Sequence, residues 1–171
     1  CLQSDDIVGV NLVAPEYYPN ALHHYHLHMK MCQWLKAKYP SVNLALHAGE
    51  LTSKLVEEEH LLFHIDEAVR IAAAGRIGHG VDILSERNKD QVLDFMKIND
   101  IAIEVLPTSN EFILDIDANR HPLMTYLEKE IPVILSTDDP GVLCCTLQEQ
   151  YFWVAKQFPE ISYMRLKSMA F

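Results

Sequence analysis

The chain has 171 residues, of which 49% are hydrophobic, and its 24 acidic residues outnumber its 14 basic ones, giving a formal net charge of -10 at pH 7. This length and composition are typical of one globular domain, and the scattered lysines and arginines exclude the basic patch that a DNA or RNA partner needs. The longest uncharged apolar stretches are far shorter than the roughly 20 residues of a membrane-spanning helix, so no membrane partner is expected.

Five apolar stretches rich in β-branched residues predict five β-strands. The stretches are continuous rather than alternating, which is typical of strands buried on both faces of a parallel sheet. Segments with helical spacing lie between them, so each strand is followed by room for one helix. The strands are expected at residues 7–13, 42–48, 76–80, 101–107 and 131–138.

This repeat of strand and helix fits two architectures. A (β/α)₈ barrel of about 250 residues uses about 31 residues for each βα unit, so this chain would hold five units and a trailing helix. A doubly wound open sheet has the same repeat and would be complete at this length. The position of the polar residues should distinguish the two.

Polar residues follow the C-terminal ends of four of the five predicted strands. His47 lies near the end of the second strand and Glu50 follows it, His79 lies near the end of the third, and Asp138 ends the fifth and is followed by Asp139. The C-terminal ends of parallel strands share one edge of the sheet, so residues far apart in sequence can meet there. The fourth strand is followed by three residues that either brace such a site as hydrogen-bond donors or simply form a turn, namely Thr108, Ser109 and Asn110.

A metal ion would explain two adjacent carboxylates at a buried strand end. Asp138 and Asp139 would repel each other and lose hydration unless a cation compensates them. The alternative is that one of them caps the helix that Pro140 begins. Because His and Asp are common zinc ligands, His47 and Asp138 are the candidate ligands.

Three neighbouring positions suit the chemistry of such a centre. Glu50 is carried past Gly49 onto the loop, where it is placed to move a proton as a general acid or base. Gly49 itself permits a sharp turn. His79 lies between Gly78 and Gly80, which allow close approach of backbone and substrate, and it is predicted to orient or polarise the attacking water.

Four motifs carry these residues: HAGE (47–50), RIGHG (76–80), PTSN (107–110) and STDDP (136–140). In this order and at this approximate spacing they resemble the adenosine deaminase family, metal-dependent purine deaminases built on a (β/α)₈ barrel. The resemblance implies an α/β fold, a partial (β/α)₈ TIM-type barrel of five parallel βα units that correspond to strands four to eight. Residues 1–171 would then be the C-terminal portion of a single barrel domain, with the N-terminal three βα units absent.

The resemblance also implies roles for individual residues. By it, His47 and Asp138 are ligands of a catalytic zinc. Glu50 is the acid that protonates N1 of the purine, and His79 assists the attack of hydroxide on C6. These roles make the full-length protein a zinc-dependent hydrolytic deaminase of adenosine or a related 6-aminopurine, with a purine nucleoside as its substrate.

Three further residues are expected beside the substrate. By the same resemblance, Asp139 bonds N7 of the base and Gly49 lies close to it. Ala14 stands where the family commonly has a glycine that approaches the substrate, and Asn11 stands where an acidic residue is common. The methyl group of Ala14 would narrow the pocket, so the exact 6-aminopurine stays open.

The zinc site departs from the family pattern. The family's first strand ends in an HxH motif that supplies two further zinc ligands, and no strand end here carries it. The two histidines are therefore expected from the missing N-terminal part. The literal match, His26-x-His28, lies within a predicted helix and indicates a solvated helix face.

Missing strands and missing ligands affect the expected activity. The first and last strands would expose unpaired edges, and two ligands would hold a metal weakly, so the 171 residues alone are expected to be inactive. Two alternatives remain. One is a non-catalytic nucleoside-binding or interaction module, and the other is a related zinc hydrolase that acts on adenine or a nucleotide.

Cysteine usage and aromatic residues add two smaller expectations. The four cysteines form no CxxC pair, which indicates reduced thiols and a cytoplasmic location. The sequence starts on Cys1 and carries no targeting segment, so any such segment was removed or never belonged to it. Four aromatic residues are expected to pack helices onto the sheet: Trp34, Tyr151, Phe152 and Trp153.

Overall fold

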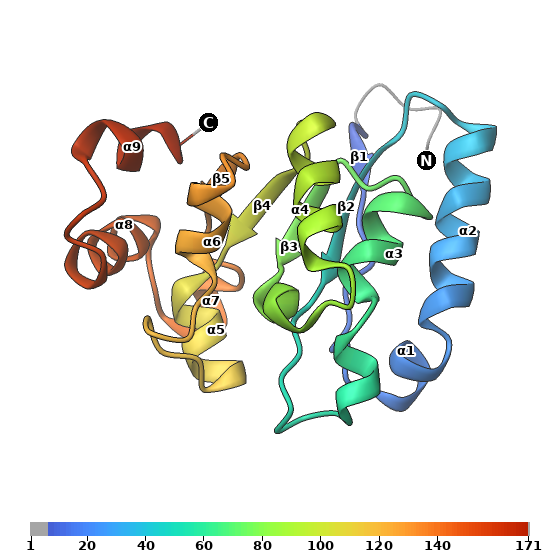
Figure 1. Ribbon diagram of the computed structural model, residues 1–171, viewed down its shortest axis with the longest axis horizontal. Helices are drawn as coiled ribbons and strands as arrows, with labels where there is room; N and C mark the ends of the chain where they lie inside the picture. The colour runs from blue at the N-terminus through green and yellow to red at the C-terminus, as the bar shows by residue number, and fades with distance from the viewer. Residues whose placement is uncertain (1–6, 171) are drawn as a thin grey trace.

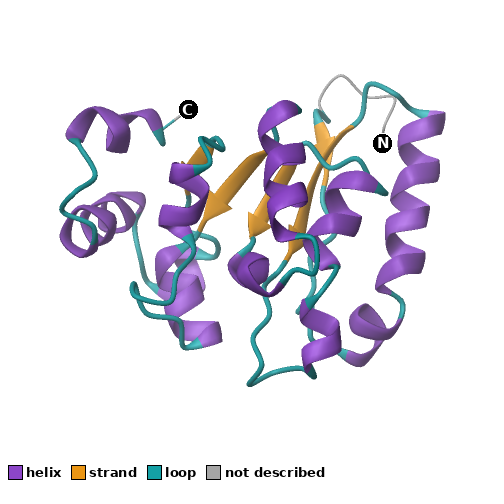
Figure 2. Cartoon of the chain, viewed as in Figure 1, coloured by secondary structure: helices purple, strands orange, loops and turns teal. Residues whose placement is uncertain are grey.

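The computed structural model describes residues 7–170 as an α/β fold (Figure 1). The strands form one sheet in the order β1-β2-β3-β4-β5, and every neighbouring pair is parallel, as the arrowheads in Figure 2 show. All five predicted strands are therefore confirmed. They are β1 (Gly9–Val10), β2 (Asn43–Ala48), β3 (Arg76–His79), β4 (Ala102–Val105) and β5 (Val133–Leu135).

The order of the strands separates the two candidate architectures. A doubly wound sheet reverses direction from its centre, so its strand order departs from the chain order. Here each strand lies next to the one that precedes it in sequence, as in a barrel. The five parallel βα units that we predict are present, and their arrangement is consistent with a partial barrel.

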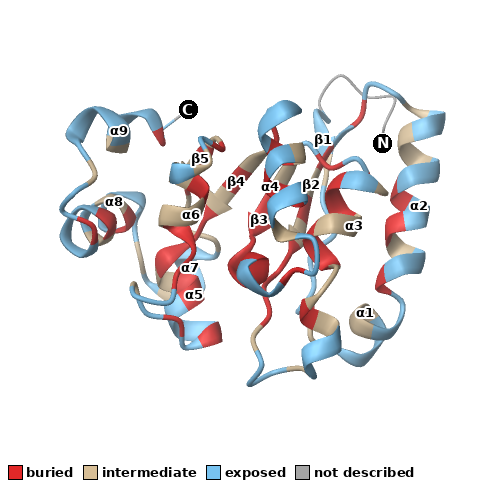
Figure 3. Cartoon of the chain, in the orientation of Figure 1, coloured by how far each residue is buried: buried red, intermediate tan, exposed pale blue. Residues whose placement is uncertain are grey.

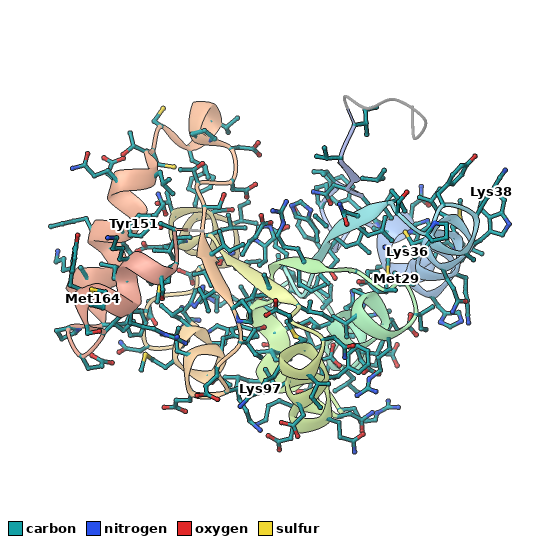
Figure 4. All side chains as sticks on the ribbon, turned by 90° about the horizontal axis from the view of Figure 1, so that it is seen from above. Met29, Lys36, Lys38, Lys97, Tyr151 and Met164 are labelled. Atoms are coloured by element: carbon teal, nitrogen blue, oxygen red, sulfur yellow. The ribbon has the colours of Figure 1, made fainter. Side chains whose placement is uncertain are left out.

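Helices connect the strands, and α3 and α4 lie in front of the sheet in Figure 1. Seen from above, α2 with Met29 and α8 with Tyr151 lie at opposite ends of the molecule (Figure 4). The helices are α1 (Pro19–His23), α2 (Tyr25–Lys38), α3 (His64–Arg70), α4 (Lys89–Ile98), α5 (Pro107–Leu114), α6 (Leu123–Glu128), α7 (Pro140–Leu143), α8 (Leu147–Gln157) and α9 (Tyr163–Ser168), with 3₁₀ turns η1 (Glu58–Leu61) and η2 (Val81–Ser85).

The hydrophobic core lies between the sheet and these helices. Leu44, Leu46 and Ala48 alternate along β2 and are buried, and Ile103 and Val105 of β4 join the same core. In Figure 3 the buried positions concentrate on the strands and on parts of the helices, while long stretches of helix surface stay exposed. Strands β2, β4 and β5 thus bury every second residue against the helices.

The other face of the sheet is only partly buried, so the prediction of burial on both faces is wrong for the described residues. Ala45 pairs with Arg76, and Arg76 pairs with Ala102, so these side chains share a row on this face. The Nε of Arg76 lies 3.1 Å from Oε1 of Glu104, which compensates both charges. The next row toward the C-terminal ends of the strands contains His47.

Two of the four aromatic residues pack as predicted. Tyr151 and Trp153 lie against the core. Trp34 and Phe152 are 61% and 68% exposed, so their predicted packing is wrong. The buried stripe of α2 runs along another side of the helix, and Lys38 Nζ lies 4.9 Å from the centroid of the Trp34 ring.

The cysteines of the described residues are free thiols, as expected. They are Cys32, Cys144 and Cys145, and Cys1 lies outside the described residues. Between residues 7 and 170, none of the helices combines the length and the apolar character needed to cross a bilayer.

Candidate active site

His47, His79 and Asp138 lie together at the C-terminal ends of β2, β3 and β5. One ring nitrogen of each histidine and one carboxylate oxygen lie within 4.8 Å of one another. The two ring centroids are 4.9 Å apart, and Nε2 of His79 lies 4.0 Å from Oδ2 of Asp138. The sheet therefore brings the proposed ligands His47 and Asp138 close together, as the sequence predicts.

Left-handed backbone conformations turn the chain at three positions of this site. Gly49 has a φ of 75°, His79 of 69° and Asp138 of 61°. For a residue with a side chain, this conformation is unfavourable by about 1–2 kcal/mol, and such strain often accompanies function. Since each of these residues follows or ends a strand, the turn interrupts the regular alternation of side chains there.

The turn at Gly49 confirms the prediction of a sharp bend. A Cβ atom at this position would lie 2.4 Å from Oδ1 of Asp82 and 2.8 Å from Cδ1 of Ile65. No larger residue fits without displacing these neighbours. Gly49 therefore places Glu50 on the inner side of the loop, where it is buried.

Glu50 lies beside His79 and carries a raised pKa. Its Oε1 is 3.6 Å from Nδ1 of His79. Burial, together with the charges of Asp138, Glu16 and Asp139, raises the pKa of Glu50 to about 8. At neutral pH the carboxyl is therefore mainly protonated and able to donate a proton.

A chain of hydrogen bonds fixes the tautomer of His79. The backbone N–H of Leu123 donates to Nδ1 of His121 (3.1 Å), so His121 carries its proton on Nε2 and donates it to Oδ1 of Asn110 (3.2 Å). The amide nitrogen of Asn110 in turn donates to Nδ1 of His79 (3.0 Å). The proton of His79 is thereby assigned to Nε2, the nitrogen that faces Asp138.

The same surroundings keep His79 neutral. Burial, together with the neighbouring His47 and His121, lowers the pKa of His79 to about 3. A neutral imidazole with one fixed proton is a directional hydrogen-bond donor at neutral pH.

The residues after β4 brace the site rather than forming a simple turn. The hydroxyl of Ser109 donates to Oδ2 of Asp138 at 2.6 Å. Thr108 donates its N–H and its hydroxyl to Oε1 of Gln150, each at 3.0 Å. Because Ser109 and Asn110 are fully buried at the start of α5, the helix holds Asp138 and His79 through two consecutive side chains.

Asp139 and Ala14 lie at the rim of the site. Asp139 is exposed and stands at the N-cap of α7, but its side chain makes no capping hydrogen bond. The alternative role in helix capping is thus not observed. Ala14 is exposed and lines a cavity of about 270 Å³ together with His47.

His47 has one further polar neighbour. Its Nδ1 lies 3.4 Å from Oδ1 of Asn11, which follows β1. When Nδ1 donates this bond, Nε2 is left as the nitrogen that can bind a metal.

The two histidines of the HxH sequence differ in position: His28 lines the cavity that His47 and Ala14 share, whereas His26 does not line it. His26 is within α2, its side chain is 60% exposed, and its Nδ1 lies 2.9 Å from Oε1 of Glu67.

Sequence reasoning missed three residues that support the site. Glu16 accepts hydrogen bonds from the backbone N–H groups of Gly49 and Glu50, and His64 contacts Glu16. The position of Glu16 soon after the first strand was a signal that could have found it, because the other site residues also follow strands. His64 and His121 have no such signal, since their contacts cross from one element to another.

Comparisons with known proteins agree with this geometry. The family model described as adenosine deaminase matches residues 2–171. An adenosine deaminase from Shewanella loihica is 28% identical over 153 residues, which are 88% of this chain and 41% of that protein. One from Escherichia coli is 31% identical over 149 residues, 86% of this chain and 39% of that protein. The chain thus spans less than half the length of these relatives.

Solved structures share the fold at low sequence identity. An adenine deaminase from Arthrobacter aurescens has a TM-score of 0.71 at 22% identity and covers 96% of this chain and 45% of its own. An amidohydrolase from Burkholderia ambifaria with bound zinc has a TM-score of 0.71 at 18% identity, with 98% and 42% covered. The N6-methyl-AMP deaminase from Arabidopsis thaliana has a TM-score of 0.60 at 23% identity, with 96% and 43% covered. Because the family model matches the sequence almost from end to end, the chain belongs to the adenosine deaminase family.

Proposed function

We propose that the full-length protein containing these residues is a zinc-dependent hydrolase that deaminates adenosine or a related 6-aminopurine. The observation that carries this proposal is the meeting of a buried acid with a candidate metal site: Glu50 lies 3.6 Å from His79, and a ring nitrogen of His79 lies within 4.8 Å of the candidate ligand atoms of His47 and Asp138. Membership of the adenosine deaminase family supports the reaction type.

The side chains present fit a zinc ion. His47 and Asp138 offer nitrogen and oxygen donors from rigid strand ends, a donor set that zinc accepts. A catalytic zinc takes more protein ligands than these two, so we propose that two further histidines come from an N-terminal part of the full-length protein. When bound, the ion would lower the pKa of a water molecule to near 7.

The residues of this chain would then divide the remaining work. Glu50 would donate its proton to N1 of the purine, which makes C6 accept a nucleophile. His79, neutral and held in one tautomer, would orient the attacking oxygen at C6 through Nε2–H. Water is added at C6, and ammonia leaves from C6. Asp139, Gly49 and Ala14 would border the base, with Asp139 at N7.

We also propose that residues 1–171 are the C-terminal portion of a single barrel domain. The coverage of about two fifths of each relative supports this, and so does the partly buried sheet face, which would line the barrel interior. Without the proposed histidines the 171 residues alone would not be active. The free thiols of Cys32, Cys144 and Cys145 support a cytoplasmic location.

The test is turnover of adenosine by the zinc-loaded full-length protein, followed by ultraviolet absorbance. We expect Glu50→Gln to lower kcat by at least about 10²-fold, because the variant cannot donate the proton to N1. Glu59→Gln, at an exposed position, is the matched control and should keep the wild-type kcat. Zinc-loaded protein that binds a purine nucleoside without converting it would instead support a non-catalytic binding module.

One observation favours the alternative that the substrate is adenine or a nucleotide. Ala14 shares a cavity with His47 and adds a methyl group at the proposed substrate side. Solved structures of similar fold include an adenine deaminase and an N6-methyl-AMP deaminase. Rates for adenosine, adenine and adenosine monophosphate, measured side by side, identify the preferred substrate, and no turnover of any of the three would contradict the proposed function.

A further inference from the structure

The loop that carries Glu50 is held by a buried carboxylate from another strand end. Glu16 follows β1 and is 4% exposed. Its Oε1 accepts the N–H of Gly49 at 3.1 Å, and its Oε2 accepts the N–H of Glu50 at 2.7 Å. Gly49 and Glu50 are themselves buried, so these two N–H groups would otherwise lack a partner in the hydrogen-bonding network that the structure describes.

A buried histidine holds Glu16 in turn. Nδ1 of His64 lies 2.5 Å from Oε1 of Glu16, and the His64 side chain is fully buried. The ring of Tyr25 stacks on His64 with a centroid distance of 3.8 Å, and the Tyr25 hydroxyl donates to the His64 carbonyl at 2.9 Å. The position of the Glu16 carboxylate is therefore set by His64 as well as by the loop.

The carbonyl side of the peptide between Gly49 and Glu50 is also fixed. The N–H groups of Val81 and Asp82 donate to the carbonyl oxygen of Gly49 at 2.8 and 3.2 Å. Together with Glu16 on the N–H side, these bonds leave the peptide between Gly49 and Glu50 little freedom to rotate. A catalytic group held this way keeps its geometry, and an error of 1 Å can lower a rate about 10²-fold.

We propose that Glu16 is a positioning residue that fixes Glu50 for proton transfer, and that His64 acts through Glu16. This inference rests on the proposed function, which assigns the acid to Glu50. Glu16 does not touch the reacting atoms in this assignment, since its hydrogen-bond contacts are to the backbone of the loop and to His64.

Glu86 provides a matched control within the same chain. It is 5% exposed, and its Oε1 accepts two consecutive backbone N–H groups, those of Ile65 at 2.6 Å and Asp66 at 3.1 Å. Glu16 uses both of its oxygens and Glu86 uses one, and the N–H groups that Glu86 binds belong to the start of α3 rather than to the loop of Glu50. In Glu86→Gln the amide oxygen can keep both of these bonds, so neither the start of α3 with His64 nor the acid should be displaced.

The experiment compares Glu16→Gln with Glu86→Gln in the zinc-loaded full-length protein. A glutamine keeps the size of the side chain but turns one acceptor into a donor that faces a backbone N–H. We expect Glu16→Gln to lower kcat by about 10- to 100-fold with KM unchanged. We expect Glu86→Gln to keep kcat at the wild-type value. Equal kcat in the two variants would overturn the inference.

A double-mutant cycle tests the role of His64. His64→Phe keeps an aromatic ring against Tyr25 but removes Nδ1, so kcat should fall with KM unchanged. Combined with Glu16→Gln, it should cause no further fall, because both changes release the same carboxylate contact. If the loss of kcat in the double variant equals the product of the two single losses, the inference is overturned. Should Glu16→Gln fail to fold, His64→Phe decides alone, and a wild-type kcat in that variant would overturn it.

Wild-type activity separates this inference from the proposed function. A wild-type protein that turns over no 6-aminopurine would overturn the proposed function and, with it, the assignment of Glu16. An active wild type whose kcat is insensitive to Glu16→Gln would overturn the positioning role alone.

Discussion

The backbone of Gly49 combines a φ of 75° with side-chain atoms of Asp82 and Ile65 packed where a Cβ would lie. We expect Gly49→Ala to lower the free energy of unfolding by about 2–4 kcal/mol, from left-handed strain together with overpacking. Gly75→Ala is the control, since a Cβ there meets nothing within 4 Å and the residue is exposed. Urea unfolding of both variants measures the difference, and equal stabilities would contradict the packing argument.

The raised pKa of Glu50 gives the reaction a definite pH dependence. The acid must be protonated to act, and its pKa of about 8 lies above neutrality because of burial and of the nearby Asp138, Glu16 and Asp139. We expect kcat/KM to fall as the pH rises through about 8, since the ionised carboxyl cannot donate. A cation that offsets the charge of Asp138 would move this midpoint lower. A pH profile of kcat/KM that rises through the same range would contradict the role of Glu50 as the acid.

At the scale of elements, α5 connects the catalytic strand ends to the rest of the fold. Asn110 on this helix links His121 to His79. In Asn110→Asp the ionised carboxylate cannot donate to Nδ1 of His79 and would draw the proton of His79 to that nitrogen. We expect kcat to fall by about 10- to 100-fold while the protein stays folded.

The control for this variant is Asn88→Asp. Asn88 is an exposed residue at the start of α4 whose side chain makes no capping bond. The substitution Asn88→Asp adds the same negative charge away from the site, so kcat should not change. A similar loss of kcat in both variants would indicate a general effect of charge rather than of the tautomer.

The strands could be predicted from the sequence because each depends on a local run of apolar residues. The meeting of His47 with Asp138 also followed, since parallel strands share one C-terminal edge. The contacts of His64 and His121 could not be predicted, because an isolated histidine gives no local sign of which distant group it will contact. Burial on a single face of the sheet was missed for a related reason. The runs are apolar on both sides, and only the described packing shows which side the helices of this chain cover.

For the whole molecule, an apolar groove lies beside the edge strand β1. It has a volume of about 540 Å³ and lies between β1, β2 and α2. On α2, Leu27, Met31 and Trp34 are 56%, 60% and 61% exposed. In the described sheet, β1 pairs only with β2. An exposed apolar surface next to an unpaired strand edge favours association with another chain or segment.

We therefore expect the 171 residues, expressed alone, to self-associate through this groove, whereas the full-length protein covers it within the barrel. Sedimentation at several concentrations measures the effect. Met31→Lys places a charge on the groove and should lower self-association of the short chain. Ile98→Lys is the control, because Ile98 is 81% exposed at the end of α4 and does not line the groove. Equal association of the two variants would mean that another surface drives it, and the proposed barrel interior on the partly buried sheet face would then be the next surface to test.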